Sequence, residues 1–328
     1  MVTKKNAQRT KNQKRNNVQL KQKHKPKYEP LTITRILDAP RERVFAAWVD
    51  ANQLAQWWGP RMFTAPVCEI DARPKGKILI HMQGPDGNIY PMSGAYLTVD
   101  EPKRLVFTSV ALDPKEKPLF ETLNTVAFTR IGKKTKLTMT ATVTKIIDAQ
   151  AAGYLSGMSA GWNQSIDKLE KYVAAAIKIA SREIVTSRII AASQARVFKA
   201  WSSATQLAEW WGPNGFTTTT NSFVFKPKKS WDYIMHGPDG RDYINKITYI
   251  EIIAPKRIVY THGGDEGEVS FHTTVTFEKT GAKGAQTKLT MRALFPTTAE
   301  RQRVIEKYGA LKGANQTIGR LAAFVERR

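Results

Sequence analysis

The stretch Trp57-Trp58-Gly59-Pro60 occurs a second time, as Trp210-Trp211-Gly212-Pro213, 153 residues further along the chain. Together the two tetrapeptides hold four of the eight tryptophans in the protein, so chance does not explain the match. The identity extends outward, because residues 44–60 and 197–213 align without a gap and agree at 12 of 17 positions. A Gly-Pro pair after an apolar helical segment is typical of a helix end. Each copy is therefore predicted to end a short helix at the same place.

Further matches follow at a nearly constant offset along both halves of the chain. A period of this size is that of a whole domain rather than of a solenoid repeat. The chain is therefore predicted to hold two tandem copies of one domain, with residues 29–180 as domain 1 and residues 181–328 as domain 2. Two of the matching pairs are Gly84-Pro85-Asp86-Gly87 with Gly237-Pro238-Asp239-Gly240, and Gly161-Trp162-Asn163-Gln164 with Gly313-Ala314-Asn315-Gln316.

Each copy shows the same sequence of expected elements. In domain 1 a strand over residues 31–37 precedes two short helices that end at Gly59-Pro60. Residues 63–143 alternate short apolar runs with tight turns, which indicates about six antiparallel strands, since the connections are too short for helical crossovers. Residues 148–177 repeat apolar side chains at three- and four-residue steps, which predicts a long amphipathic helix. The expected fold class is α+β, with a curved antiparallel sheet wrapped on the long C-terminal helix.

Residues 1–28 are predicted to be a disordered basic tail. Residues 1–27 contain ten Lys or Arg and no acid, and they have almost no apolar side chains that could offset the entropy of ordering. One interpretation is a solubilising tail. The other is non-specific electrostatic contact with nucleic acid or an acidic partner.

Composition narrows the class of protein. The chain has 328 residues, 41% of them hydrophobic, and no apolar run approaches the roughly 20 residues that a membrane helix needs. The N-terminus lacks the layout of a secretory signal. The single cysteine, Cys68, rules out an intrachain disulfide, and a lone thiol is typical of a reducing compartment. We therefore expect a cytoplasmic protein with no membrane span.

Several motifs together resemble a known family. The Trp57-Trp58-Gly59-Pro60 element, the Gly84–Gly87 hairpin, the Pro102–Val106 run and the Gly161-Trp162 pair are similar to those of the START-like (SRPBCC) superfamily. The nearest branch is the homologues of the C-terminal domain of the heat-shock protein 90 ATPase activator. Domain 2 departs from the pattern at residues 191–193, where a proline is missing, and at Ala314, which replaces the helix tryptophan.

The resemblance implies a helix-grip fold with a pocket between the sheet and the long helix. It implies a non-catalytic binding protein for a small hydrophobic molecule as the first hypothesis. Alternatives are a co-chaperone-like module that binds a chaperone or another protein, and a cyclase-like or hydrolase-like enzyme. A further alternative is nucleic-acid contact through the basic tail. The fold alone does not decide among these functions.

Two patterns predict which side chains face such a pocket. One is the alternation of side chains between the two faces of each strand (strand parity), and the other is the apolar stripe of the long helix (helix stripe). Tyr90, Tyr243, Asn163 and Asn315 are the expected polar groups, although any one of these positions also fits a plain core residue. Ile78, by strand parity, and Leu311, by the helix stripe, are also predicted to face the pocket. The candidate ligand-binding residues are Trp48, Trp58, Ile80, Met82, Tyr90, Met92, Met158 and Trp162 in domain 1, and Trp201, Trp211, Trp231, Tyr233, Met235, Tyr243 and Tyr308 in domain 2.

Three glycines, Gly153, Gly157 and Gly161, lie four residues apart in the predicted long helix. Each costs up to about 1 kcal/mol of helix stability relative to alanine. The sequence leaves two explanations open. Close packing of the helix on the sheet is the first, and room for a ligand is the second.

No catalytic, cofactor or metal motif is present in the sequence. None of the five histidines forms a metal-ligand pair, and parity places His81 and His236 on the outer face of their strands. His262 and His272 flank a loop peculiar to domain 2, where either could act as a base only if it turned inward. No glycine-rich phosphate loop and no nucleophile elbow occur. We therefore expect no catalytic residue, no metal site and no cofactor.

Overall fold

The computed structural model describes residues 28–263 and 271–327 of the chain. The predicted basic tail over residues 1–27 lies outside the described residues. The chain divides into two compact units between Ala175 and Ala176, near the end of the long helix; we keep the names domain 1 and domain 2 and count this whole helix in domain 1. Each is described by itself. None of the helices in the described residues combines the length and the apolar character that a membrane crossing requires.

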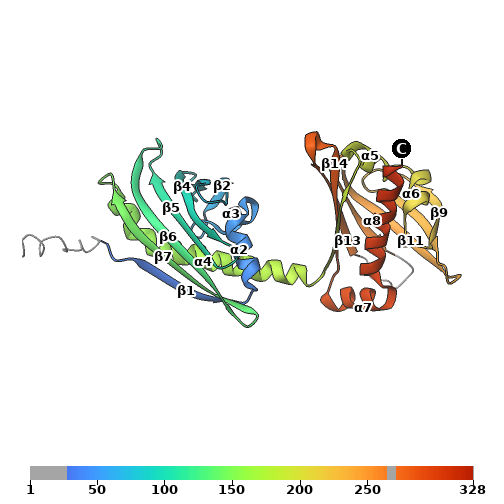
Figure 1. The fold of residues 1–328 in the computed structure, drawn as a ribbon, viewed down its shortest axis with the longest axis horizontal. Helices are drawn as coiled ribbons and strands as arrows, with labels where there is room; N and C mark the ends of the chain where they lie inside the picture. Colours follow the sequence, from blue (N-terminus) through green and yellow to red (C-terminus); the bar gives the residue numbers. More distant parts are fainter. Residues whose placement is uncertain (1–27, 264–270, 328) are drawn as a thin grey trace, which may run out of the picture. The chain divides into compact units, whose positions relative to one another are not determined.

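Domain 1 contains one seven-stranded antiparallel sheet, in the order β1-β7-β6-β5-β4-β3-β2. Strands β2 to β7 pair in sequence, and β1 pairs with β7, where Ile33 lies opposite Met139. The predicted order of strand, two short helices, six strands and long helix is confirmed (Figure 1). The strands are β1 (Leu31–Leu37), β2 (Thr64–Ile70), β3 (Lys77–Gln83), β4 (Ile89–Asp100), β5 (Arg104–Leu112), β6 (Pro118–Ile131) and β7 (Lys134–Ile146).

The short helices of domain 1 end at Trp57, just before Gly59-Pro60 as predicted, whereas the long helix covers residues 151–180 rather than 148–177. Helix α2 (Arg41–Val49) starts after Pro40, and α3 (Ala51–Trp57) starts at Asp50, whose side chain accepts a hydrogen bond from the backbone N–H of Gln53. Helix α4 (Ala151–Ala180) is the long helix that the sheet wraps. Its buried side chains include Ile166, Leu169 and Val173, which belong to the predicted apolar stripe.

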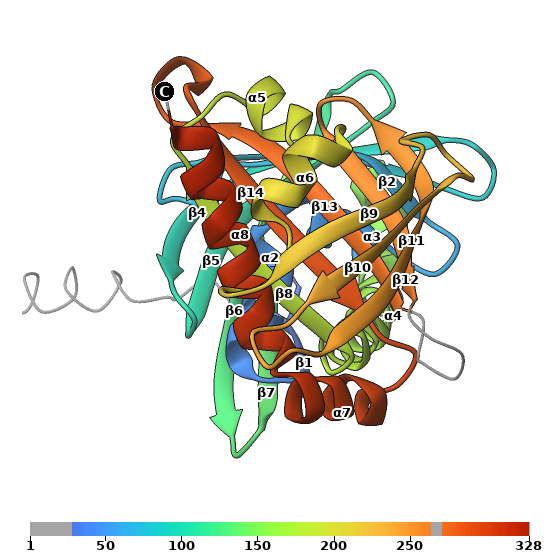
Figure 2. The same ribbon diagram turned by 90° about the vertical axis from the view of Figure 1, so that its right-hand side faces the viewer.

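Domain 2 repeats this architecture with the sheet order β8-β14-β13-β12-β11-β10-β9 (Figure 2). Its short helices are α5 (Gln194–Lys199) and α6 (Ala204–Trp210). The α+β class with tandem helix-grip domains is thus confirmed. The strands are β8 (Glu183–Ile190), β9 (Thr217–Phe223), β10 (Ser230–His236), β11 (Asp242–Ile253), β12 (Arg257–Gly263), β13 (Phe271–Thr280) and β14 (Gln286–Leu294), with a 3-10 turn, η2 (Ala282–Gly284), between the last two.

The long helix of domain 2 is divided, which the sequence comparison did not predict. Helix α7 (Thr298–Tyr308) ends at Gly309, and α8 (Ala310–Glu326) begins directly after it. Gly309 has φ 60° and ψ 33°, a left-handed conformation that glycine adopts without strain. The corresponding residue of domain 1, Gly157, stays inside the continuous helix α4. The same glycine therefore ends a helix in one copy and not in the other.

The Trp-Trp pair is the centre of each core. Trp57 and Trp210 are fully buried, and their indole N–H groups donate to the backbone carbonyls of Ala47 (2.9 Å) and Ala200 (3.1 Å). These bonds tie the second short helix to the first. The buried rings of Trp48 and Trp201 pack against the same pairs, with centroid distances of 4.7 Å to Trp57 and 5.0 Å to Trp210.

A cation from the long helix holds the Trp-Trp-Gly-Pro loop in each domain. The ammonium of Lys168 donates to three loop carbonyls. At the matching position, Nη1 of Arg320 lies within hydrogen-bond distance of four loop carbonyls, which share its two N–H groups. Burial lowers the pKa of both groups, so the carbonyls compensate for partial loss of hydration. The carbonyls are those of Trp58 (3.3 Å), Pro60 (3.5 Å) and Phe63 (3.0 Å) for Lys168, and of Trp211 (3.5 Å), Gly212 (3.0 Å), Pro213 (2.8 Å) and Phe216 (2.9 Å) for Arg320.

Replacing Lys168 with methionine keeps most of the side-chain volume and removes the donor. We expect Lys168→Met to lower the free energy of unfolding by about 1–3 kcal/mol, because partly buried carbonyls lose a charged partner. Urea denaturation of the full chain, followed by circular dichroism, measures the change. Lys171→Met, at an exposed position of the same helix, is the matched control and should shift the midpoint little. Equal effects of the two substitutions would contradict the role of Lys168.

Candidate functional site

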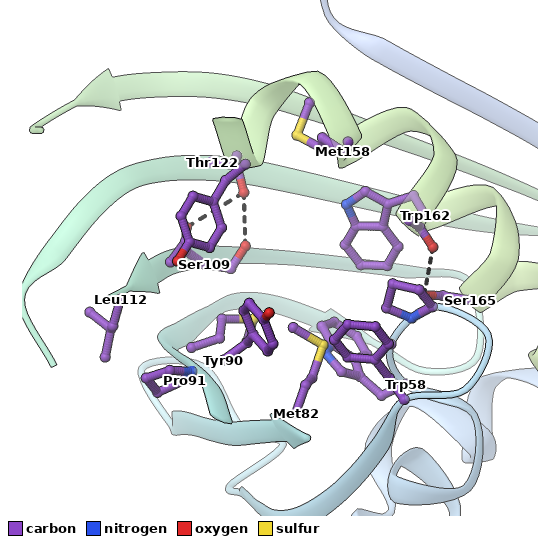
Figure 3. A pocket seen from close by; sticks show the side chains of 18 of the residues that line it. Trp58, Met82, Tyr90, Pro91, Ser109, Leu112, Thr122, Met158, Trp162 and Ser165 are labelled. Atoms are coloured by element: carbon purple, nitrogen blue, oxygen red, sulfur yellow. Dashed lines mark hydrogen bonds between the residues drawn. The ribbon is translucent and has the colours of Figure 1, made fainter. Parts of the chain in front are cut away.

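A cavity of about 350 Å³ lies in domain 1 between the long helix α4, the sheet and the Trp-Trp-Gly-Pro loop (Figure 3). This volume is within the usual range of small-molecule sites, about 300–1,000 Å³. Its walls are apolar and aromatic, and no charged side chain lines it. Six of the candidate residues predicted for domain 1 line the cavity, namely Trp58, Met82, Tyr90, Met92, Met158 and Trp162.

The other two candidates of domain 1, Trp48 and Ile80, are buried but do not line the cavity. Trp48 lies behind the wall, where its ring stacks on Trp162 at a centroid distance of 6.4 Å. Ile78 has the same parity as Ile80 and is also a core residue. Parity thus identified the correct face of β3. Of the three side chains on that face, only Met82, nearest the C-terminal end of the strand, reaches the cavity.

Several lining residues were missed by the sequence analysis. Ser109 on β5 and Thr122 on β6 line the cavity, as do Phe120 and, on α4, Tyr154. Parity along β5 could have found Ser109, because it lies two residues after the buried Phe107 on the same face. The pairing of Ser109 with Thr122 across two strands, by contrast, depends on register, which the sequence alone did not fix.

The three helix glycines all line the cavity. A Cβ atom built on Gly153 or Gly157 meets nothing within 4 Å, and one on Gly161 approaches only Pro60, at 3.6 Å. Close helix–sheet packing is therefore wrong as the explanation for Gly153 and Gly157. Their missing side chains instead leave open space along the cavity wall.

Ser109, Thr122 and Asn124 form a buried polar cluster beside the cavity, and all three are less than 10% exposed. The amide nitrogen of Asn124 donates to Ser109 Oγ (2.8 Å) and Thr122 Oγ1 (3.0 Å). The two hydroxyl oxygens are 2.8 Å apart. Figure 3 shows the two hydroxyls beside each other, with Trp58 and Trp162 further along the cavity. The cavity is therefore largely apolar, with this cluster as one polar spot and the Ser165 hydroxyl, which donates to the Gly161 carbonyl at 2.9 Å, as another.

Tyr90, an expected polar group, lines the cavity with its ring packed between Phe63 (5.4 Å) and Tyr154 (6.4 Å). Its hydroxyl donates to Asp86 in the hairpin, at 3.4 Å. Loss of hydration, with a smaller contribution from Asp86, raises the pKa of Tyr90, so the phenol stays neutral. In domain 2, Tyr243 makes the matching contact with Asp239 at 3.5 Å.

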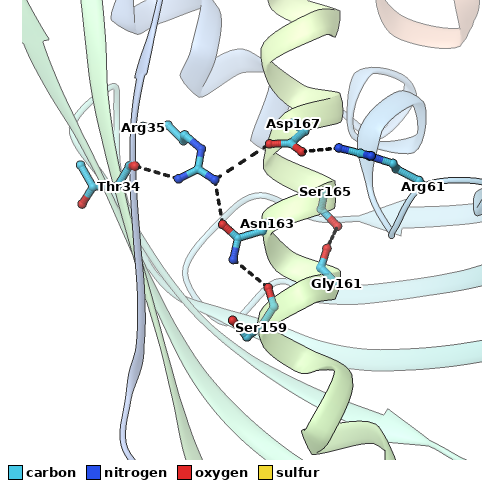
Figure 4. Close-up of polar contacts among 8 residues, drawn as sticks. All are labelled: Thr34, Arg35, Arg61, Ser159, Gly161, Asn163, Ser165 and Asp167. Carbon is cyan, nitrogen blue, oxygen red and sulfur yellow. Dashed lines mark hydrogen bonds and ion pairs between the residues drawn. The ribbon is translucent and has the colours of Figure 1, made fainter.

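Asn163, the second expected polar group, does not line the cavity. Figure 4 shows it turned toward β1, where its carbonyl accepts a hydrogen bond from Arg35 at 2.8 Å. Asp167 lies on the same side of α4 and accepts from Arg61 at 3.0 Å. Asn315 of domain 2 likewise bonds to Thr186 at 2.6 Å. These asparagines fasten the helix to the first strand of each domain.

The domain 2 candidates lie mostly inside a packed core. Trp201, Trp211, Trp231 and Tyr233 are each no more than 6% exposed. Trp231 and Tyr233 stack at 4.0 Å, at the positions that Ile78 and Ile80 occupy in domain 1. Met235 and Tyr243 are partly buried, whereas Tyr308 is 40% exposed on α7, as is Leu311 at 43% on α8. Domain 2 therefore has large sheet side chains at positions where domain 1 has smaller ones.

All three histidines of domain 2 have defined partners, and that of His272 is the hydroxyl of Thr261 at 3.3 Å. His236 lies at the surface, as parity predicted, and contacts Asp242 at 2.6 Å and Thr219 at 2.9 Å. His262 is turned inward and lies 3.2 Å from the hydroxyl of Tyr233. Loss of hydration raises the pKa of Tyr233 well above its usual value, so this buried phenol stays neutral.

The other reactive groups of the described residues are not arranged for chemistry. Burial, with a smaller contribution from Asp50, raises the pKa of the Cys68 thiol to about 11, which keeps it protonated and unreactive at neutral pH. Within residues 28–263 and 271–327, no group of three His, Cys, Asp or Glu side chains is placed to hold a metal ion.

The chain matches one protein family and is similar to many solved structures. The family model described as "Activator of Hsp90 ATPase homolog 1-like protein" matches residues 38–174 and again residues 191–326. The comparison with curated proteins gave no significant match.

Three of the similar solved structures illustrate the likeness in fold. A protein from Arthrobacter aurescens is 22% identical, covering 46% of this chain and 89% of its own, with a TM-score of 0.42. One from Nitrosomonas europaea is 26% identical, covering 45% and 96%, with a TM-score of 0.39. The AHSA1 protein of Silicibacter pomeroyi is 23% identical, covering 45% and 99%, with a TM-score of 0.39.

The three glycines of α4, which we call the glycine stripe, give a test of the open space in domain 1. We expect Gly157→Ala to raise the free energy of unfolding by about 0.5–1 kcal/mol, because alanine is the better helix former and its Cβ meets no atom. Thermal unfolding measures the change. Gly94→Ala is the contrasting variant, since its Cβ would lie 2.0 Å from the Thr108 carbonyl oxygen and should destabilise the domain. Destabilisation by Gly157→Ala would show that the helix packs closely there.

Proposed function

The chain belongs to the family of activator of Hsp90 ATPase homolog 1-like proteins through both of its domains, and on that premise we propose that domain 1 binds a small, mostly apolar molecule. The binding site is the cavity between α4 and the sheet. The observation that carries this proposal is the combination of apolar walls and a glycine stripe that leaves their space open. The proposed function is binding without catalysis.

The cost of the glycines supports this proposal. Gly153 and Gly157 lie within α4, where each lowers helix stability by up to about 1 kcal/mol relative to alanine. No neighbouring atom requires them, because an added Cβ would meet nothing within 4 Å. Their retention is explained if side chains at these positions would occupy the volume that a ligand needs.

The ring arrangement also favours a ligand. Trp58 and Trp162 meet edge to face at a centroid distance of 5.1 Å, and both line the cavity. Trp162 is in addition fixed by stacking on Trp48. Rings held in this way present a preformed apolar surface, which reduces the ordering cost of binding. Met82 and Met158 complete this wall with flexible side chains that adapt to the shape of a ligand.

Domain 2 differs in the residues that would form the corresponding cavity. Trp231 and Tyr233 occupy the sheet positions, and Ala310 and Ala314 replace the Met158 and Trp162 of the helix. We therefore propose that domain 1 is the binding domain and that domain 2 keeps the fold with a filled interior. A stoichiometry of one ligand per chain follows.

The remaining alternatives have less support. A co-chaperone-like role rests on the family description alone. An enzyme would need an acid–base pair, and the cavity lining consists of apolar side chains, hydroxyl groups and glycine backbone. Nucleic-acid contact through residues 1–27 stays a prediction, because those residues lie outside the described part of the chain.

Blocking the cavity tests the proposed function. The neutral apolar dye N-phenyl-1-naphthylamine should bind the full chain with a stoichiometry of one and gain fluorescence. Gly157→Leu should weaken this binding at least about tenfold, because the new side chain enters the cavity volume. Ala152→Leu, at an exposed position of the same helix that does not line the cavity, is the control and should bind like the parent. Equal dye binding by both variants would exclude the cavity as the site.

A further inference from the structure

The polar cluster of Ser109, Thr122 and Asn124 has one more hydroxyl proton than it can use internally. One N–H of the Asn124 amide is shared between Ser109 Oγ and Thr122 Oγ1, at 2.8 and 3.0 Å, and the carbonyl of Phe107, at 3.5 Å, is the acceptor for the other. Both hydroxyl oxygens therefore act as acceptors. Only one hydroxyl–hydroxyl bond, of 2.8 Å, is available to the two remaining protons. One O–H group is thus left over.

The backbone offers no good acceptor for this proton. The nearest is the carbonyl of Ser109, which lies 3.5 Å from Thr122 Oγ1. That distance is well beyond the 2.7–2.8 Å usual for a bond between two oxygens. The better arrangement has Thr122 donating to Ser109 Oγ and the Ser109 hydroxyl donating elsewhere. Ser109 lines the cavity, so its proton is directed to the cavity side.

The hydrogen bonds of the cluster act in series. The amide of Asn124 donates to Thr122, which donates to Ser109, and each bond polarises the next, so the terminal O–H is a stronger donor than an isolated serine. All three side chains are more than nine-tenths buried. A buried donor without an acceptor is unfavourable, so a ligand that supplies one is favoured over a plain hydrocarbon.

The electrostatics of the cavity select a neutral ligand. No Lys, Arg or His lines it, and neither does any acid. An ionised carboxylate or ammonium would lose its hydration without gaining a counter-charge. Burial also raises the pKa of Tyr90, which keeps this lining phenol uncharged.

We propose that the ligand of domain 1 is a neutral carbonyl compound whose oxygen accepts a hydrogen bond from Ser109 while its apolar body lies against Trp58 and Trp162. The ligand class includes ketones, aldehydes and esters with an aromatic or alkyl body. This inference rests on the proposed function, and it adds the chemical group that the site selects. Ser109 is the ligand-binding residue, and Thr122 and Asn124 are positioning residues that act through it.

The second copy shows the same strand pairs without the cluster. In domain 1, Ser109 is opposite Thr122 and Phe107 is opposite Asn124. In domain 2 the matching pairs are His262 with Phe271 and Tyr260 with Thr273. The polar cluster is therefore a feature of the domain that has the cavity, and it is not required for the fold.

The test uses two probes of nearly the same shape, 2-acetylnaphthalene and 2-isopropenylnaphthalene, which differ by a carbonyl oxygen in place of a methylene group. Their dissociation constants are measured on the full chain by displacement of N-phenyl-1-naphthylamine. We expect the ketone to bind about two- to tenfold more tightly than the hydrocarbon, as one net hydrogen bond would give. Ser109→Ala should remove this preference, so that the two probes bind with equal affinity. Thr122→Val, a near-isosteric change, should reduce the preference.

A spectroscopic measurement separates the hydrogen bond from a change of fold. The infrared carbonyl band of bound, isotope-labelled 2-acetylnaphthalene should lie at lower wavenumber than that of the ketone in hexane. Ser109→Ala should return the band to its hexane position. Binding of 2-isopropenylnaphthalene with a measurable dissociation constant shows that each variant keeps its cavity.

Equal affinity for the two probes, or a preference that survives Ser109→Ala, would overturn the carbonyl assignment and leave apolar binding in place. Failure of both probes to bind would instead contradict the proposed function and this inference together.

Discussion

The carbonyl groups of the Trp-Trp-Gly-Pro loop, held by one cation from the long helix, are the interaction on which each domain depends. Lys168 and Arg320 reach the same loop in the two copies, although they do so with different geometry. The loop joins the short helices to the second strand of the sheet, so fixing it also fixes the position of the long helix. The indole bonds of Trp57 and Trp210 then lock the two short helices together.

These hydrogen bonds fix the loop and the short helices in both domains, while the side chains of the interior differ between the copies. In domain 1 the helix supplies the large side chains Trp162 and Met158, and the sheet has the smaller Ile78 and Ile80. In domain 2 the large side chains, such as Tyr233, come from the sheet, and the helix supplies Ala314. The first arrangement leaves a cavity beside the glycines of α4. Two domains with one architecture therefore differ in how their interiors are filled.

Most of the fold could be predicted from the sequence. The repeat shows two copies of one domain, and the alternation of apolar residues marks the strands within each copy. Parity also placed Met82 and Met92 on the cavity side, and helical spacing did so for Trp162. The polar cluster could not be predicted, since Ser109, Thr122 and Asn124 meet only through the register of two strands. The helix break at Gly309 could not be predicted either, because the matching residue of domain 1, Gly157, lies inside a continuous helix.

The central claim is that domain 1 has an open apolar cavity and that domain 2 has filled the same space. A crystal of the full chain equilibrated with xenon gas tests it most directly, because xenon enters apolar cavities and is located by its scattering. The account predicts xenon between Trp58, Met158 and Trp162 and none beside Trp231 and Tyr233. Xenon at both places, or at the domain 2 position alone, would contradict it.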